Sequence, residues 1–328
     1  MELDPISDIF RTFQIDALVQ SRLEATAPWA LSMDAQPGDQ KSGGFFAQRP
    51  GVAYFGFLSR GTCWLELPEE KELLTLGEGD CFLLAPDTSF RLSDQPHGHP
   101  ISFCSLRGKS IDNVVRYGGG GPPTTLIWGL LQLRQGGLQP LRALLPRSIV
   151  LQQEQARSGG VGALVQLLAE EMAGPQPGSE VAANRLAEVL FIQILRSFVK
   201  ASSHSKKTGW LSAIFDPSIG AALRAIHADI KRAWTVEALA QLAGMSRSSF
   251  AERFKLLLRE TPMQYVASWK MQKSLTLLAD GGTKLSEIAR QVGYETDAAY
   301  SKAFRRVVGM TPGKYRAQKL TVDDEGSI

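Results

Sequence analysis

The last third of the chain contains one pattern of residues twice. Five positions of the first copy recur 49 residues later and five more recur 50 residues later, so the second copy carries one extra residue in its middle. The matched positions are Val236, Leu239, Ala240, Gly244 and Met245 with Leu285, Ile288, Ala289, Gly293 and Tyr294, then Phe250, Phe254, Thr261, Pro262 and Tyr265 with Tyr300, Phe304, Thr311, Pro312 and Tyr315. A solenoid with repeats of this length needs three or more copies to bury its faces. Two copies instead predict a compact helical module used in tandem.

Each copy has the pattern of a helix-turn-helix. In the first copy, Thr235 is placed to cap a helix over residues 236–242, residues 243–245 form a turn, and Ser246 can cap a second helix that runs to about residue 257. The corresponding segments of the second copy are 286–292, 293–295 and 296–307, and a helix over 263–278 joins the copies. Aromatic residues four positions apart predict a buried inner face on each second helix. The residues expected in the core are Phe250, Phe254, Tyr300, Phe304 and Trp269.

The charge of the chain is distributed unevenly. Residues 205–320 contain 19 Lys and Arg against 9 Asp and Glu, a net charge of +10, while the rest contains 17 against 24, a net charge of −7. A basic domain on an otherwise acidic chain is typical of proteins that bind a polyanion. The coincidence of this basic region with the repeat predicts binding to double-stranded DNA.

The outer faces of the two second helices are the candidate DNA-reading surfaces. Such a helix enters the major groove, where its first residues contact base edges and flanking basic side chains contact phosphates. A rigid connecting helix would hold the two second helices one turn of DNA apart, roughly 34 Å. The candidate DNA-binding residues, for each of which a solvated helix face is the alternative, are Ser246, Arg247, Ser248, Ala251, Glu252, Thr296, Asp297, Ala298, Ser301, Lys302 and Arg305.

Residues 1–110 have the pattern of an all-β domain. Short runs rich in aromatic and branched residues, such as 52–58, 62–67, 81–84 and 101–106, are separated by turn residues, which favours a sandwich or barrel. Residues 151–208 contain two helical segments, 161–172 and 182–199. The second is apolar over a wide arc, which indicates either burial within its own subunit or a helix pair shared between two subunits. We therefore predict three parts: an N-terminal domain over residues 1–150, a helical linker or dimerisation segment over residues 151–208, and the tandem helix-turn-helix domain over residues 209–320.

Composition excludes several classes. The chain has 328 residues and no run of 18 apolar residues, so we expect no membrane span, and its first ten residues lack the pattern of a secretory signal. The three cysteines, Cys63, Cys81 and Cys104, are widely spaced and match no zinc pattern, which is typical of reduced thiols in a cytoplasmic protein.

The carboxy-terminal residues resemble the AraC/XylS family of bacterial transcription regulators. The resemblance covers about residues 217–319 and is carried by Ile288-Ala289, Val292-Gly293-Tyr294, Phe304-Arg305-Arg306, Gly309 and the run 311–316, Thr-Pro-Gly-Lys-Tyr-Arg. It implies base contacts by Ser248, Ala251, Glu252, Asp297, Ala298, Ser301 and Lys302, and activation through contact with RNA polymerase. The first copy departs from many relatives in offering Ala251 and Glu252, where longer donors are common, so we expect the second copy to hold DNA more strongly.

The β region resembles the cupin-type sensor domains found in a subset of that family. The resemblance covers about residues 3–150 and is carried by residues 3–8, 61–65, 77–80, Pro86 and 116–121. It implies a barrel that holds one small effector molecule. The candidate effector-binding residues, for which packing or surface exposure is the alternative, are Tyr54, Phe57, Trp64, Arg91, Arg107 and Arg116; an arginine there would favour an anionic effector.

We find no pattern of a catalytic or metal site. Metal-dependent cupin enzymes need histidines and a carboxylate that converge, but residues 54–58 contain no histidine, and His97 and His99 lie in a loop-like sequence. We therefore expect no enzyme activity, no metal and no cofactor.

The resulting prediction is an α+β multidomain chain with a cupin-like N-terminal β-barrel, a helical middle segment and an all-α C-terminal domain with two helix-turn-helix motifs. The predicted function is an effector-controlled, homodimeric DNA-binding transcription regulator. The alternatives are a constitutive DNA-binding regulator whose N-terminal domain only dimerises, and a cupin enzyme with a DNA-binding appendage.

Overall fold

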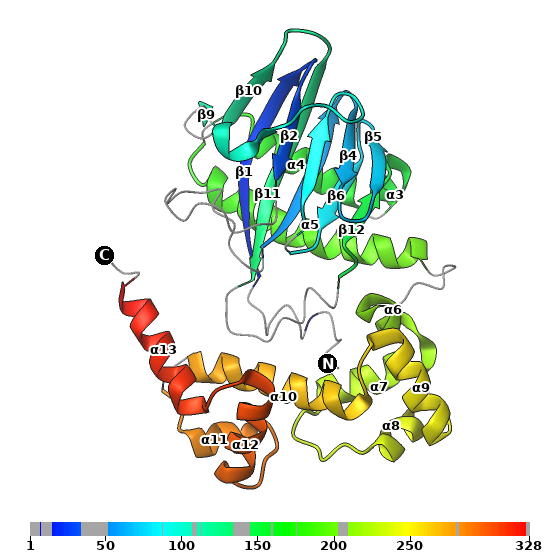
Figure 1. Ribbon diagram of the computed structural model, residues 1–328, viewed down its shortest axis with the longest axis vertical. Helices are drawn as coiled ribbons and strands as arrows, with labels where there is room; N and C mark the ends of the chain where they lie inside the picture. The colour runs from blue at the N-terminus through cyan, green and yellow to red at the C-terminus, as the bar shows by residue number, and fades with distance from the viewer. Residues whose placement is uncertain are drawn as a thin grey trace. The chain divides into compact units, whose positions relative to one another are not determined.

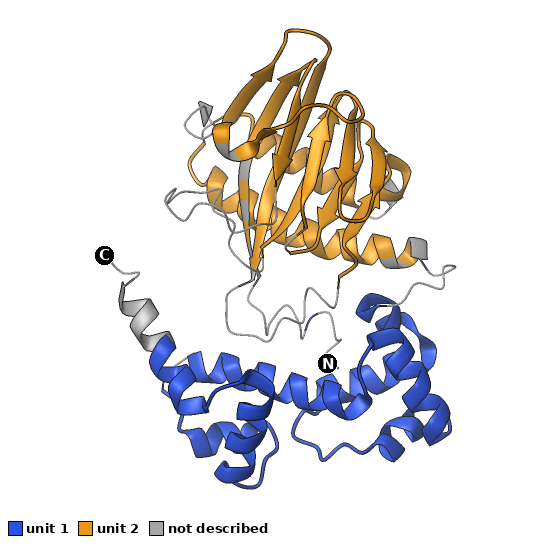
Figure 2. Ribbon diagram, in the orientation of Figure 1, with its two compact units in different colours: residues 1–14, 134–144, 205–328 blue, residues 15–133, 145–204 orange. Residues whose placement is uncertain are grey.

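The computed structural model divides the chain into two compact units (Figure 2). It describes Ser7 and residues 15–33, 52–86, 88–106, 110–111, 113–133, 145–158, 160–174, 176–202, 209–279 and 282–325. One unit comprises residues 15–133 and 145–204, and the other comprises residues 1–14, 134–144 and 205–328.

In the described part of the first unit, the strands form two sheets (Figure 1). The seven-stranded sheet has the order β12 (Ser148–Leu151), β6 (Cys81–Leu84), β3 (Val52–Arg60), β11 (Pro123–Leu133), β1 (Ile15–Thr26), β10 (Val114–Gly118) and β9 (Ser110–Ile111). The five-stranded sheet has the order β5 (Glu72–Leu76), β4 (Cys63–Leu67), β7 (Phe90–Ser93), β2 (Ala30–Met33) and β8 (Ile101–Ser102), and a short 3-10 helix, η1 (Phe103–Leu106), follows β8. The prediction of a cupin-like β domain is confirmed.

The core of this unit is built from alternate residues of the strands. On β4, Cys63, Leu65 and Leu67 are at most 1% exposed, whereas the two residues between them are only half-buried. This alternation follows from the two-residue period of a strand with one face on a core. A chain of tilted aromatic contacts runs through the core, with ring centroids 5.2 Å apart for Tyr54 and Phe90, and 5.2 Å apart for Phe103 and Trp128.

Three helices, α3 (Gln153–Ser158), α4 (Val161–Glu171) and α5 (Ser179–Ser202), belong to the same compact unit as the sheets. Helix α5 packs against α4 and the seven-stranded sheet, and its Asn184 Oδ1 accepts a hydrogen bond of 3.0 Å from the amide of Val19. That bond lies where the pairing of β1 with β11 shifts register, so the side chain satisfies an amide at the irregularity.

The apolar arc of α5 is buried within its own subunit, the first of the two alternatives. Its buried apolar residues are Ala183, Ala187, Leu190, Phe191, Ile194 and Leu195. The segment 151–204 belongs to the same compact unit as the β strands, and the division from the helical unit near residue 204 lies close to the predicted start of the third part at residue 209. Val189 of the predicted arc and Val181 are exposed.

The described part of the second unit consists of helices (Figure 1). They are α6 (Trp210–Phe215), α7 (Pro217–Ala228), α8 (Val236–Leu242), α9 (Arg247–Leu258), α10 (Pro262–Ala279), α11 (Leu285–Gln291), α12 (Asp297–Val308) and α13 (Pro312–Glu325). Helix α10 connects the two repeats and contacts α9 on one side and α11, α12 and α13 on the other. The predicted connecting helix over 263–278 is thus confirmed.

None of the helices described is both long and apolar enough to cross a membrane.

Candidate nucleic-acid interface

The two repeats fold into two helix-turn-helix units, α8 with α9 and α11 with α12. Each turn contains a glycine with positive φ, Gly244 at 63° and Gly293 at 77°, a conformation that residues with a Cβ adopt only at a cost. The next residue donates its amide to a carbonyl of the first helix, 3.0 Å for Met245 and 2.8 Å for Tyr294. The extra residue of the second copy is Glu295, which lengthens the turn before the cap of α12.

The caps lie where the sequence predicts them. Thr235 Oγ1 accepts from the amide of Ala238 at 3.1 Å, and Ser246 Oγ accepts from the amide of Ser249 at 3.2 Å. In the second copy, Thr296 Oγ1 accepts from the amide three residues later, also at 3.2 Å. These bonds satisfy amides that the first turn of a helix leaves unpaired and so fix where α8, α9 and α12 begin.

The predicted inner faces are buried. Phe250, Phe254 and Phe304 have no exposed surface and Tyr300 is 1% exposed. The two aromatic rings of α9 lie 5.6 Å apart in a tilted arrangement, and those of α12 lie 5.8 Å apart in a T-shaped one. Trp269 on α10 is 4% exposed, which confirms it as a core residue. The aromatic side chains therefore hold the second helices on their units and leave the opposite faces to solvent.

The outer face of α9 carries two serines, an alanine, an arginine held in an ion pair, and the exposed charged residues Glu252 and Lys255. Of the predicted residues, Ser246, Arg247, Ser248 and Glu252 are exposed, and Ala251 is half-buried. Arg247 Nε forms an ion pair of 2.7 Å with Glu237 of α8, in which both side chains are more than half exposed.

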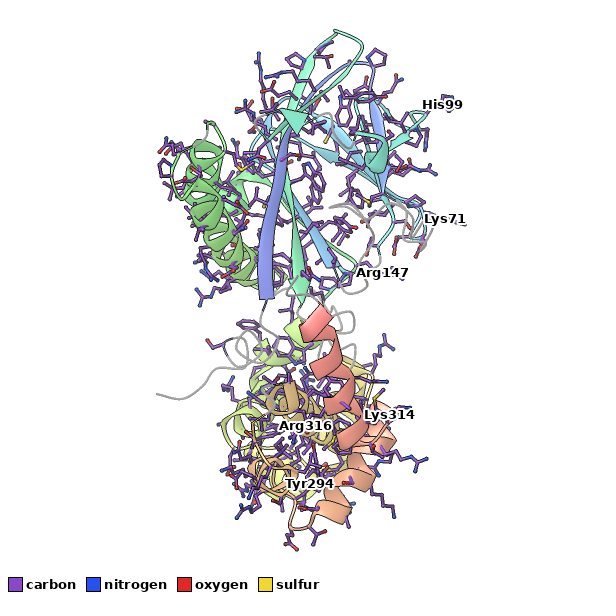
Figure 3. All side chains as sticks on the ribbon, turned by 90° about the vertical axis from the view of Figure 1, so that its left-hand side faces the viewer. Lys71, His99, Arg147, Tyr294, Lys314 and Arg316 are labelled. Carbon is purple, nitrogen blue, oxygen red and sulfur yellow. The ribbon has the colours of Figure 1, made fainter. Side chains whose placement is uncertain are left out.

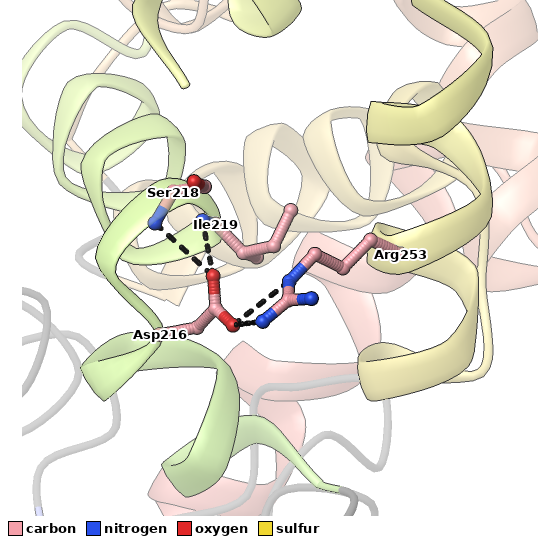
Figure 4. Close-up of polar contacts among 4 residues, drawn as sticks. All are labelled: Asp216, Ser218, Ile219 and Arg253. Atoms are coloured by element: carbon pink, nitrogen blue, oxygen red, sulfur yellow. Dashed lines mark hydrogen bonds and ion pairs between the residues drawn. The ribbon is translucent and has the colours of Figure 1, made fainter. Parts of the chain in front are cut away.

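A second arginine of α9, Arg253, is held by a carboxylate from outside the repeat (Figure 4). Asp216 lies between α6 and α7, and one of its oxygens accepts from the amides of Ser218 and Ile219 at 3.1 and 2.9 Å. The other oxygen accepts from Arg253 Nε at 2.9 Å. Burial by itself raises the pKa of Asp216, but the hydrogen bonds from Arg253 and the two amides outweigh it and lower the pKa. Asp216 lies outside the repeat and was not predicted as a site residue, although an Asp before Pro217 is a recognisable signal for the start of a helix.

The outer face of α12 is different. Asp297, Ala298, Lys302 and Arg305 are exposed and Ser301 is half-buried, so all the predicted residues of this helix lie on its outer face or in its first turn. Among the residues that the structure describes, no carboxylate forms an ion pair with Lys302 or Arg305. Lys302 and Arg305 of the second copy are therefore available to a ligand, whereas Arg247 and Arg253 of the first copy are each paired with a carboxylate.

A groove of about 640 Å³ lies beside α10, between the end of α9 and the end of α12. Its lining includes Arg259, Glu260, Met263, Arg306 and Val307. Burial raises the pKa of Glu260 to about 7, so this carboxyl group is partly protonated at neutral pH. None of the predicted DNA-binding residues lines the groove.

The candidate effector-binding residues do not gather at one place. Tyr54 belongs to the buried core between the sheets. Phe57 and Trp64 lie on their strands at positions that alternate with core residues, so they face the opposite side of their sheets. Arg107 lies outside the described residues.

The other two arginines are held at the surface by carboxylates. Arg91 pairs with Glu66 at 3.5 Å and its side chain is 40% exposed, while Arg116 pairs with Glu24 at 2.9 Å and is 66% exposed. For these two candidates the structure shows the alternative of surface exposure, because each sits on the outward-facing register of its strand.

The histidine pair lies as the loop pattern indicates. His97 and His99 are both exposed in the loop between β7 and β8, and His99 is labelled in Figure 3. Among the residues described, no three His, Cys, Asp or Glu side chains converge as a metal site requires. Cys63 and Cys81 are buried free thiols.

Comparison with known proteins agrees with this architecture. A cupin model matches residues 4–200, and a helix-turn-helix domain model matches residues 239–318. A putative AraC-like transcription regulator of Streptomyces lividans is 31% identical over 314 residues, which cover 96% of this chain and 98% of that protein. A putative AraC-like transcription regulator of Streptomyces antibioticus is 30% identical over 318 residues, which cover 97% of this chain and 100% of that protein.

These matches identify a DNA-binding transcription regulator and not an enzyme, so the alternative of a cupin enzyme with a DNA-binding appendage is excluded. They extend over both units, from the β domain to the tandem helix-turn-helix. The chain belongs to the AraC-like family of transcription regulators.

Proposed function

We propose that the protein is a cytoplasmic regulator that binds promoter DNA sequence-specifically, with α9 and α12 in adjacent major grooves. The observation that carries this proposal is the pair of equivalent helix-turn-helix units in one basic unit, with their capped N-termini exposed. Helix N-termini of this kind approach base edges and phosphates.

Helices α9 and α12 contribute unequally to DNA affinity. Lys302 and Arg305 have no competing carboxylate among the described residues, so they can neutralise phosphates without first breaking an ion pair. Arg247 must give up Glu237 to do the same. Helix α12 therefore supplies most of the affinity, and α9 adds discrimination through short side chains such as Ser248.

The test is binding of the full chain to the DNA fragment upstream of its own gene, measured by fluorescence anisotropy over a series of salt concentrations. Each lost phosphate contact lowers the slope of log affinity against log salt by about 1. Lys302→Ala and Arg305→Ala should each show this loss together with weaker binding. Arg185→Ala, which removes an exposed charge on α5, far from the helix-turn-helix units in the sequence, is the control. Unchanged affinity and slope in both α12 variants would refute this assignment.

Control by a small effector in the β domain is the second part of the proposal. The indole Nε1 of Trp29 is buried in the core of the β domain and has no hydrogen-bond partner among the described residues. A buried donor of this kind favours a ligand with an acceptor atom. Tyr54 lies in the same core. A metabolite that raises the unfolding temperature and changes DNA affinity, with both effects lost in Trp29→Phe, supports this assignment; if no metabolite does so, the constitutive alternative is favoured.

We further propose that the protein acts as a homodimer and, when bound to a promoter, contacts RNA polymerase. The exposed apolar side chains of the helices on the β domain, Leu167, Val181 and Val189, support a subunit contact there. Sedimentation of the full chain should give a dimer that Val189→Glu weakens. A monomer at micromolar concentration contradicts this part.

A further inference from the structure

The two helix-turn-helix units meet at a buried ammonium group. Lys270 of α10 is only 7% exposed, and its Nζ donates to the carbonyl oxygen of Gly293 at 3.3 Å. The same Nζ lies 5.4 Å from the centroid of the Tyr294 ring, which is labelled in Figure 3. Gly293 and Tyr294 form the turn before α12. The connecting helix α10 therefore contacts the turn that sets the direction of α12.

The same turn touches the loop that leads into the first copy. A Cβ added to Gly293 would lie 2.2 Å from the carbonyl oxygen of Lys231, so the backbone of the second copy is in direct contact with this loop. Lys231 belongs to the loop 229–235, which connects α7 to α8, the first helix of the first copy. No side chain separates the two backbones, so the turn before α12 is positioned directly against the segment from which α8 begins.

The loop 229–235 is itself well ordered. Asp229 Oδ1 accepts from the amide of Arg232 at 3.2 Å, and the Asp229 carbonyl accepts from Trp234 Nε1 at 2.9 Å. The Arg232 guanidinium lies over the Trp234 ring, 4.4 Å from its centroid. These contacts fix the conformation of the loop 229–235, against which the Gly293 turn packs.

The charges of Lys270 and Asp229 link the connecting helix to the loop 229–235. Burial lowers the pKa of Lys270, and the nearby negative charge of Asp229 opposes that effect. The ammonium therefore interacts with a carboxylate of the loop that precedes the first copy and with a carbonyl of the second copy. A buried cation without such partners is strongly unfavourable, so this loop and the Gly293 turn must keep their positions around it.

We infer that Lys270, the Gly293 turn and the loop 229–235 form a junction that fixes the orientation of α12 relative to α9 and thereby selects the spacing between the two DNA half-sites. This inference rests on the proposed reading of DNA by both helices. Lys270 is a positioning residue, because it acts through the turn and does not itself contact DNA. A protein that holds two DNA-binding helices in a fixed arrangement gains affinity for DNA with one spacing between half-sites and loses affinity for DNA with other spacings.

The experiment varies the DNA and the protein together. The two contacted grooves are first located by footprinting the full chain on its own upstream fragment. One to three base pairs are then inserted between them; each insertion turns one half-site by about 35° around the helix axis and moves it by about 3.4 Å. Affinity is measured for wild type, Lys270→Met, Lys270→Arg and the control Lys273→Met, which alters another lysine of the same helix.

We expect a single inserted base pair to weaken wild-type binding at least tenfold. Lys270→Met should bind the native spacing more weakly and should shrink the penalty of the insertion at least threefold, because the copies are no longer held together. Lys270→Arg should restore most of the selectivity, and Lys273→Met should match wild type. A loss of stability alone would lower binding to every spacing by the same factor and would leave the penalty unchanged.

Three results overturn the inference. Wild-type protein that tolerates all spacings equally shows that the copies are not rigidly joined, and this result needs no variant. An unchanged insertion penalty in Lys270→Met shows that Lys270 does not hold them. Absence of any footprint by the wild-type protein overturns the proposed function as well, which distinguishes the two failures.

Discussion

Helices α9 and α12 end in the same left-handed conformation with different residues, so the repeat contains its own control. Arg259 has φ 63° and ψ 9°, and Gly309 has φ 85° and ψ −9°. Each donates its amide to the carbonyl four residues earlier at 2.9 Å. A Cβ at Gly309 would meet nothing within 4 Å, so a substitution there changes the backbone preference and no contact.

The magnitude follows from two opposing terms. A left-handed conformation costs a residue with a Cβ about 1–2 kcal/mol. Glycine costs about 0.4–1 kcal/mol through the greater freedom of the unfolded chain. The difference predicts that Gly309→Ala lowers the free energy of unfolding by about 1 kcal/mol and that Arg259→Gly raises it by about the same amount. The double variant should lie near wild type, because the two sites share no partner.

The assay is urea unfolding of the full chain, with hydrogen exchange followed in peptides from α9 and α12 so that each effect is assigned to its own helix. Gly309→Ala should speed exchange at the end of α12, and Arg259→Gly should slow it at the end of α9. Destabilisation of α9 by Arg259→Gly would contradict this prediction, since side-chain contacts of Arg259 would then outweigh the cost of its left-handed backbone.

Three further predictions concern single groups. Asp216→Ala should destabilise the helical unit by about 2 kcal/mol, because it removes a helix cap and an ion pair, whereas Arg253→Ala removes the ion pair alone and should cost about 0.5–1 kcal/mol. Because the pKa of Asp216 is lowered, its contribution to stability should fade as the pH falls below 3.8. Equal costs for both variants in urea unfolding would contradict the capping role of Asp216. Burial raises the pKa of Glu260 from 4.5 to about 7, so the stability that its protonated form contributes is full below pH 4.5 and is lost as the pH rises through 7. In urea unfolding at pH 5 to 8, Glu260→Gln should be more stable than wild type at pH 8 by about 1–2 kcal/mol, a figure reduced for the partial exposure of the group. Parallel pH profiles of the two proteins would count against this prediction. Burial also raises the pKa of Cys63 and Cys81 to about 12, so peptide mapping after iodoacetamide at pH 8 should find both modified only in urea; rapid labelling of the native chain would disprove their burial.

Local signals sufficed for the tandem helical domain. Capping residues such as Thr235 and Ser246, the glycine of each turn and aromatic residues four positions apart act over one or two helical turns, so they can be recognised without any knowledge of the tertiary fold. The one-residue difference between the copies likewise corresponds to a single added turn residue, Glu295.

The β domain was less predictable. Its strands follow from composition, but which face of a strand is buried depends on the partner sheet, and an error of one residue exchanges the two faces. Trp64, Arg91 and Arg116 were therefore only candidates for the interior, and each lies on the outward register. The helical segment was separated from the β domain because its apolar arc is equally consistent with a dimer contact and with packing on its own sheet.

The sequence by itself determined that the chain ends in a doubled, basic helix-turn-helix and begins with a β domain, because periodicity, caps and charge are written in residues close together along the chain. Only the tertiary structure decided which cations remain available. Arg253 is paired with Asp216, 37 positions away, and Lys270 is buried against a turn 23 positions away, whereas Lys302 and Arg305 are left for a ligand. Long-range pairing of this kind leaves no local pattern, since it depends on how the helices pack and not on the spacing of residues within any one of them.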